Sequence, residues 1–235
     1  MRTRHLITAL LATGLLLAGC SGSSDSSDSD GGGDTAGLSA RLAAAKKTLD
    51  GAETISIKLS TKSLPDGITG LLSAEGKGNH SPAFDGKVTV VTGGASIGAD
   101  VIATGGKVYA KTGFLPSFTA IDPATLKAPD PATLLATDGG ITEILVRTEG
   151  LTEDGKSRDG KDVLTTIKGT LPGSLVQTII PSAAVAKDFA VTYRLDDDDN
   201  LRDATLTGPF YPGGGSVTYT VTLTTSDTPV TIEAP

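Results

Sequence analysis

The sequence contains very few of the residues on which cysteine and histidine chemistry depends. Its 235 residues include one cysteine, Cys20, and two histidines, His5 and His80. One cysteine excludes an intramolecular disulfide and a cysteine-based metal cluster, and two histidines exclude a multi-histidine metal site. Tryptophan is absent and aromatic residues make up only 4% of the chain. We therefore expect an interior of small aliphatic side chains, with no metal and no cofactor.

Enzymes that use a histidine base have one candidate in the body of the chain. A hydrolase of this kind needs a nucleophile beside a base. His5 lies in an N-terminal leader, and His80 follows Asn79 in a turn-like stretch, which predicts a solvated loop histidine. The run Asp196–Asp199 lacks the glycine and the distal glutamate of a calcium loop, so we interpret it as a solvated hairpin turn. These observations favour a protein that is not an enzyme.

A long apolar run is also missing. The longest, Leu6–Ala18, would reach about 20 Å as a helix, whereas the apolar core of a bilayer is about 30 Å thick. Together with Arg2 and Arg4 it is typical of a secretory signal peptide over residues 1–19. The run ends in Leu-Ala-Gly-Cys, which matches the lipobox of bacterial lipoproteins and implies acylation of Cys20. The alternative is an ordinary cysteine that follows small residues by chance.

The next segment, residues 20–37, is rich in serine, glycine and aspartate and contains no large apolar side chain. Such a segment buries too little surface to offset its chain entropy, so we expect a flexible tether. The remaining residues, 38–235, are expected to form a single domain. Lys and Arg total 20 against 27 Asp and Glu, a net charge of −7, and the basic residues are scattered. A nucleic-acid partner is therefore not expected.

Apolar periodicity predicts an α+β domain. A period near 3.6 predicts a helix at Leu38–Leu49, one or two short helices within Pro131–Arg147, and a helical piece at Pro172–Ile180. Alternation predicts strands at residues 54–60, 72–77, 87–90, 99–103, 107–111, 151–158, 163–169, 189–195, 204–206 and 217–223. Glycine turns at hairpin spacing indicate an antiparallel meander. Its apolar face needs helices as a cover, over an interior that is either tightly filled or hollow.

The order of these segments resembles a known family. The lipobox, the tether and the Ala-rich helix are followed by Gly-Lys-Val at 86–88, a hairpin over Ala99–Ala110 and Ile-Asp-Pro-Ala-Thr-Leu at 121–126. The stretch DGKDVLTTIKGTLP at 159–172 and the C-terminal strands complete the match. In this order and spacing the chain is similar to the LppX/LprA/LprF/LprG family of actinobacterial lipoproteins.

The resemblance implies a curved antiparallel β half-barrel whose concave face is covered by helices, as in LolA and LolB, and which encloses an apolar cavity. It implies binding of acyl chains of a triacylated glycolipid, a phosphatidylinositol mannoside-type lipid or triacylglycerol, and their carriage toward the outer envelope. The expected location is the extracytoplasmic face of the cell membrane, held by the lipid anchor. A major-facilitator transporter is the implied protein partner.

The inward positions of the predicted strands and helices are the candidate wall of this cavity. They are Ile57, Leu59, Leu72, Val88, Val90, Val101, Leu134, Ile141, Ile144, Leu145, Leu175, Ile179, Val191, Tyr193, Val221 and Leu223. A proline-bounded loop with Phe114, Leu115 and Phe118 is the candidate entrance lip, although simple loop packing explains these residues equally well. Each wall residue also fits ordinary core packing, so a scaffold lipoprotein with a filled core is the alternative function.

Overall fold

The computed structural model describes residues 34–235. The predicted signal peptide (1–19), the lipidation site Cys20 and the tether up to residue 33 lie outside the described residues. Within the part that is described, no helix is long and apolar enough to cross a membrane.

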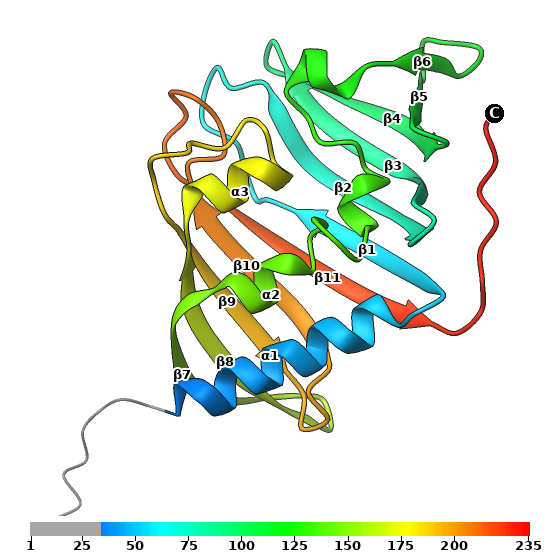
Figure 1. Ribbon diagram of the computed structural model, residues 1–235. Helices are drawn as coiled ribbons and strands as arrows, with labels where there is room; N and C mark the ends of the chain where they lie inside the picture. The colour runs from blue at the N-terminus through cyan, green and yellow to red at the C-terminus, as the bar shows by residue number, and fades with distance from the viewer. Residues whose placement is uncertain (1–33) are drawn as a thin grey trace, which may run out of the picture. The chain divides into compact units, whose positions relative to one another are not determined.

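One antiparallel sheet of eleven strands forms the body of the molecule (Figure 1), and its order is β6-β5-β4-β3-β2-β1-β11-β10-β9-β8-β7. The strands are β1 (Thr54–Ser60), β2 (Gly70–Asn79), β3 (Ala83–Thr92), β4 (Ala95–Thr104), β5 (Lys107–Thr112), β6 (Thr119–Ile121), β7 (Glu149–Asp159), β8 (Asp162–Leu171), β9 (Phe189–Leu195), β10 (Leu201–Gly208) and β11 (Val217–Ser226). Because β6 and β7 are opposite edges, the sheet stays open. This is the curved half-barrel that the family resemblance implies.

The sheet consists of two meanders. Strands β1 to β6 follow one another in sequence and in space, and so do β7 to β11. They join where β1 pairs with β11, with Ile57 opposite Leu223 and Leu59 opposite Val221. We call them the N-terminal meander (β1–β6) and the C-terminal meander (β7–β11). The predicted strands all occur, and β6 is an additional short strand that the irregular, proline-rich sequence around it does not indicate.

The helical elements are α1 (Thr35–Asp50), the 3-10 turns η1 (Pro123–Leu126) and η2 (Thr133–Leu135), and the α-helices α2 (Glu143–Arg147) and α3 (Gly173–Ile179). Helix α1 begins three residues before the predicted Leu38, because the Asp34 carboxylate caps it by accepting the N–H of Gly37 at 2.9 Å. The end of the predicted tether therefore belongs to the helix. Its buried stripe is Leu38, Leu42, Ala45 and Leu49, as the periodicity predicts.

The central helices are shorter than the sequence predicts. Within the expected range Pro131–Arg147 only η2 and the five-residue α2 form. Gly139 lies between them with φ +70°, a left-handed backbone conformation that a right-handed helix cannot contain. The segment Asp122–Thr148, which we call the strap, connects β6 to β7. Since these strands are opposite edges of the sheet, the strap crosses the concave face (Figure 1).

Candidate functional site

Cross-strand register brings the predicted wall residues of the strands to one face. One row runs from Val88 through Ala74 and Leu59 to Val221. The same row continues through Ala204 and Tyr193 to Ile167. Ile57, Val90, Val101, Val191 and Leu223 lie on this face by the two-residue alternation of a strand. The sheet thus has a continuous apolar concave side.

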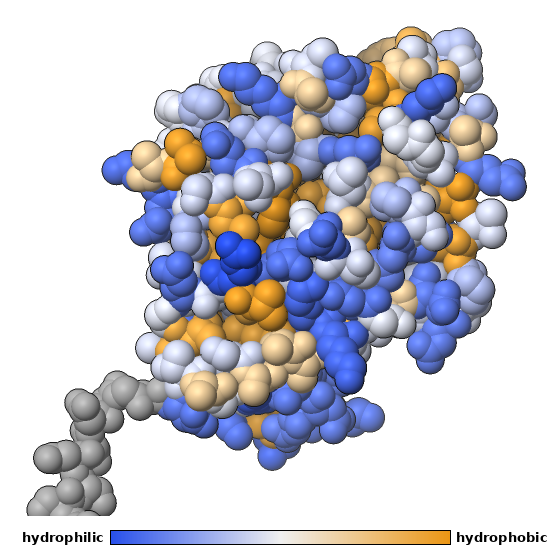
Figure 2. Space-filling model, viewed as in Figure 1, coloured by the Kyte–Doolittle hydropathy of each residue, from blue (hydrophilic) through white to orange (hydrophobic). Residues whose placement is uncertain are grey.

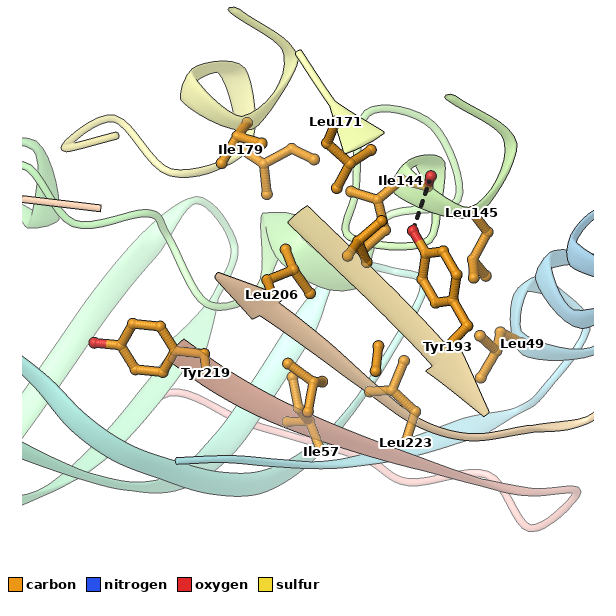
Figure 3. Packing of buried hydrophobic residues seen from close by; sticks show 14 of the residues in the cluster. Leu49, Ile57, Ile144, Leu145, Leu171, Ile179, Tyr193, Leu206, Tyr219 and Leu223 are labelled. Atoms are coloured by element: carbon orange, nitrogen blue, oxygen red, sulfur yellow. Dashed lines mark hydrogen bonds between the residues drawn. The ribbon is translucent and has the colours of Figure 1, made fainter. Parts of the chain in front are cut away.

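Over the C-terminal meander this side is tightly covered. Ile167, Tyr193 and Leu195 have no exposed surface, and Val191 is 2% exposed. The covering residues Ile144, Leu145 and Ile179 are buried, and Leu134, Ile141 and Leu175 are half-buried against the same cluster. Figure 3 shows side chains of α2, of α3 and of the sheet meeting in this layer. All six predicted covering residues therefore pack on the sheet.

The space enclosed beneath α2 is small. A cavity of about 10 Å³ lies between Ile141, Thr142, Ile144 and Leu145 of the strap and five side chains of the sheet, namely Leu201, Ala204, Leu206, Val221 and Leu223. This volume holds about one water molecule, whereas pockets for drug-sized ligands measure about 300–1,000 Å³. The family resemblance implies a large enclosed apolar cavity. Beneath α2 the side chains fill almost all of that space.

Over the N-terminal meander the concave side is covered only in part: Ile57, Val101, Ala103 and Val108 are buried, whereas other residues of this side stay accessible. Several aliphatic residues there remain half-buried, and we call six of them the open apolar face: Leu59, Leu71, Val88, Val90, Ala99 and Ala110. Figure 2 shows apolar side chains at the surface between α3 and α2, and further apolar atoms toward the N-terminal meander. An aliphatic surface of this kind, on the hollow side of a curved sheet, is suited to an apolar ligand and offers no acid, base or nucleophile to react with it.

A β-bulge shapes one end of this face. The β2–β3 register shifts between Leu71 and Ser73, so Leu71 pairs with Val90, and the predicted wall residue Leu72, also half-buried, lies at the bulge. Counting every second residue back from Ala74 predicts that Leu72 lies on the concave side and that Leu71 does not. The bulge adds one residue to the strand, and a two-residue period does not account for it. Leu71 is thus a candidate that the sequence analysis missed.

Two tyrosines bind the backbone of the bulge. The Leu71 N–H donates to the Tyr211 hydroxyl at 2.9 Å, the Tyr219 hydroxyl donates to the Leu71 carbonyl, and the two hydroxyl oxygens are 2.7 Å apart. Burial raises the pKa of Tyr219, and its hydrogen bond with Tyr211 raises it further. The two neutral phenols therefore join the C-terminal meander to β2 beyond the end of the short strand β1.

The predicted entrance lip does not assemble on the concave side. Phe114 is 90% exposed and Leu115 is 45% exposed. Phe118 lies beneath the Lys111 ammonium, 5.2 Å from ring centre to nitrogen, and lines a groove of about 780 Å³ with residues such as Lys58, Asp85 and Lys87. Since Lys111 is on the outward side of β5, Phe118 belongs to the outer face. The lip interpretation of Phe118 is therefore wrong.

The outer face carries charge where the concave side carries aliphatic groups. One cross-strand row alternates in sign over five strands: Lys58, Glu75, Lys87, Asp100 and Lys111. The Lys87 ammonium lies 2.6 Å from the Asp100 carboxylate, and this hydrogen bond with its charge attraction lowers the pKa of Asp100. The two faces of one sheet thus differ in chemistry: the outer face is charged and the concave face is aliphatic.

Two further predictions concern polar residues. The Asp196–Asp199 run is a hairpin turn, in which the Asp196 side chain accepts backbone N–H groups and Asp199 is held by Arg41 at 2.5 Å. His80 is not a solvated loop residue. It is half-buried, with Nδ1 2.6 Å from the carbonyl oxygen of Leu135 and Nε2 3.2 Å from that of Leu49. Sequence-local reasoning missed these contacts, because both partners are distant in the chain.

The fold and the site together define a class: an open antiparallel half-barrel, polar outside, with an aliphatic concave side that helices and a strap cover only in part. The chain belongs to the LppX_LprAFG lipoprotein family, whose sequence pattern matches residues 37–233. Among curated proteins, none matches this sequence.

Solved structures agree with this assignment. LprF from Mycobacterium bovis is similar with a TM-score of 0.66 at 17% identity, over 86% of this chain and 98% of that chain. Lipoprotein LppX from Mycobacterium tuberculosis is similar with a TM-score of 0.58 at 19% identity, over 85% of this chain and 100% of that chain. At these identities the likeness concerns the fold.

Proposed function

We propose that the protein binds the acyl chains of lipids or lipoglycans on its concave side and carries or presents them toward the outer envelope. The observation that carries this proposal is the open apolar face, where Leu59, Leu71, Val88 and Val90 stay half-buried although Ile167, Tyr193 and Leu195 of the neighbouring meander are fully buried. A ligand chain laid on this face completes the burial that the helices leave unfinished.

The energetics favour a carrier with this architecture. Burial of one methylene is worth about 0.8 kcal/mol, so a sixteen-carbon chain that leaves a membrane loses on the order of 12 kcal/mol. Only a protein that replaces most of these apolar contacts moves such a chain through water at a useful rate. The aliphatic concave side supplies these contacts, and the charged outer face keeps the carrier itself in water.

The finer features of the proposal rest on the family and on the predicted lipobox. Cys20 carries the lipid anchor, which holds the domain at the extracytoplasmic face of the cell membrane. The ligand is a triacylated glycolipid, a phosphatidylinositol mannoside-type lipid or triacylglycerol. A major-facilitator transporter in the same membrane is the proposed protein partner. No nucleic acid, metal or cofactor takes part.

Mass spectrometry of an organic extract from the natively purified, folded protein tests the proposal. We expect an acylated lipid in near-stoichiometric amount, and a matched extract of heat-denatured, washed protein should lack it. Extracts without lipid, from preparations that also fail to take up an added pyrene-labelled lipid, would contradict lipid binding.

A second candidate is a scaffold lipoprotein with a filled core. The tight packing of the C-terminal meander and the cavity of about 10 Å³ favour it. The same extraction separates the two candidates, because a scaffold needs no bound lipid.

A further inference from the structure

The strap passes over the concave side of the sheet. It joins opposite edges of the sheet, and its regular parts are only η1, η2 and α2. It forms one wall of the small cavity, and its η2 turn packs against β3. A strap that lifts would therefore connect this cavity with the open apolar face.

Side-chain hydrogen bonds fasten the strap at three places. At one, Lys46 of α1 contacts Glu143 at 3.2 Å and the Thr137 carbonyl at 3.0 Å, and Thr142 donates to Asp50 at 2.8 Å. Burial acts to lower the pKa of Lys46, but Asp50 and Glu143 outweigh this and raise it, so Lys46 stays charged.

The second fastening is neutral. Tyr193 of β9 lies with its hydroxyl 2.7 Å from the Thr148 hydroxyl, and it donates to the Ile144 carbonyl at 3.3 Å (Figure 3). Both Lys46 and Tyr193 therefore hold the α2 end of the strap.

The third fastening is His80, and it holds the η2 end. The imidazole lies between two backbone carbonyls, that of Leu135 on the strap and that of Leu49 in the last turn of α1. Neutral imidazole has one N–H, whereas imidazolium has two. Only the protonated ring can donate to both oxygens, and the negative end of the α1 dipole favours this cation.

The strap is also seated at this point. Leu135 is 2% exposed, and a Cβ added at Gly78 on β2 would be 2.3 Å from its Cδ1 atom. The missing side chain of Gly78 thus makes the space that Leu135 fills. The polar contact of His80 and the apolar seat of Leu135 act on the same residue of the strap.

We propose that the His80 imidazolium is a latch that holds the strap down, and that loss of its proton frees η2 and connects the open apolar face with the small cavity beneath α2, so that an acyl chain reaches the covered part of the concave side. This inference rests on the proposed function, because it assigns the control of ligand uptake. The neutral ring keeps one donor, so its second nitrogen presents a lone pair to a carbonyl oxygen.

Other charged groups occur on each element that packs against His80. They are Lys46, Lys47 and Asp50 on α1, Glu53 after it, Asp130, Asp138 and Glu143 on the strap, and Lys77 and Asp85 on the β2–β3 hairpin. Histidine is the side-chain type that ordinarily changes charge between about pH 5 and 8. Because protonation supplies the second ring N–H, the strap is expected to be closed when His80 is protonated and open when the ring is neutral.

Nitrogen-15 NMR of the histidine ring tests the latch without any lipid. In the full chain carrying His5→Gln, His80 gives the only histidine signals. At pH 5.5 we expect both ring nitrogens to be protonated and both N–H protons to be protected from exchange. A single protonated ring nitrogen at pH 5.5, in a folded protein, would overturn the proposal.

Uptake of a pyrene-labelled diacylglycerol tests the consequence. We expect uptake about tenfold faster at pH 8 than at pH 5.5, the order of change that loss of one charge-assisted hydrogen bond produces. The variant His80→Gln, which cannot gain charge, should be fast at both pH values. His80→Arg, a permanent cation, should be slow at both. Equal pH dependence in the parent protein and in His80→Gln would refute the latch.

The two hypotheses fail differently. If no labelled lipid binds at any pH, the proposed function is wrong, while the ring NMR still decides whether His80 holds the strap as a cation. If lipid binds at rates that ignore pH in the parent protein, lipid binding stands and the latch is wrong. Amide hydrogen exchange at Ile141, which donates within the strap to Leu134 at 2.8 Å, checks the strap in case a variant is poorly folded.

Discussion

The two meanders use the same kind of concave surface in different ways. In the C-terminal meander, α1, α2 and α3 cover the aliphatic rows so closely that Ile167 and Leu195 have no exposed surface. In the N-terminal meander, residues of the same rows, such as Val88 and Leu59, remain half-buried. The comparison shows that the C-terminal half of the sheet is closely packed, whereas part of the concave side of the N-terminal half stays accessible, as the proposed function requires.

The largest expected difference is in stability. Leu195→Ala should lower the free energy of unfolding by about 2–5 kcal/mol, because it removes a fully buried side chain and leaves a cavity. Leu59→Ala, the same change on the open apolar face, should cost about 1 kcal/mol, since water already contacts Leu59. Urea denaturation measures both. Equal losses would mean that the two meanders are equally packed.

Lipid binding should show the opposite pattern. Val88→Trp places a large ring on the open apolar face and should weaken binding of a pyrene-labelled lipid at least tenfold, with little loss of stability. Thr89→Trp is the matched control, because Thr89 is the next residue of β3 and faces outward opposite Ser73. Unchanged binding by Val88→Trp would remove the open apolar face as the site.

Tyr193 tests how much one buried hydroxyl group contributes to the stability of the packed C-terminal meander. Tyr193→Phe should lower the free energy of unfolding by about 1–2 kcal/mol, because it removes the hydroxyl that binds Thr148 and Ile144. Tyr109→Phe, on the outward side of β5, should change it by less than about 0.5 kcal/mol. Thermal and urea unfolding of the pair checks this. No loss in Tyr193→Phe would show that its hydroxyl does not fasten the strap.

The pH dependence of the same variant has a defined sign. Burial raises the pKa of Tyr193, and the Thr148 hydrogen bond only partly opposes this. A group whose pKa is raised by folding stabilises the fold below its unfolded pKa, here about 10, and loses this contribution as the pH rises further. The free energy of unfolding should therefore fall above about pH 10, and less steeply in Tyr193→Phe. An identical slope in both proteins would contradict this assignment.

The smallest effect is expected at Thr165. This residue of β8 has no exposed surface, and in the part of the chain that is described its hydroxyl has no hydrogen-bond partner. Thr165→Val keeps the shape and removes a buried polar atom, so we expect a gain of up to about 1 kcal/mol in unfolding free energy. A clear loss in urea denaturation would mean that the hydroxyl is bonded in solution.

The spacing of apolar residues in the sequence predicted the inward faces of the strands and the buried stripe of α1. Alternation placed Ile57, Val88 and Val221 on one face because the side-chain period of a strand depends only on neighbouring residues. The α1 stripe followed for the same reason, although the Asp34 cap extended the helix beyond its predicted start. The order of the meanders came from the family resemblance and from glycine turns.

What the sequence did not predict depends on contacts between distant residues. The bulge that brings Leu71 to Val90 adds a residue to one strand and shifts the alternation. His80 meets Leu135 only because the strap crosses the sheet, and the strap crosses because the three-residue β6 forms the far edge. Phe118 directly precedes this short strand and lies on the outer face, so it does not form the predicted entrance lip.

The most direct measurement of ligand position uses the absence of tryptophan from the chain. Val90→Trp places the only indole on the open apolar face, and Thr89→Trp places it on the outer face. On addition of a lipid with brominated acyl chains, we predict strong quenching of the indole fluorescence in Val90→Trp and almost none in Thr89→Trp. Equal quenching in the two proteins, or quenching at Thr89→Trp alone, would contradict acyl-chain binding on the concave side.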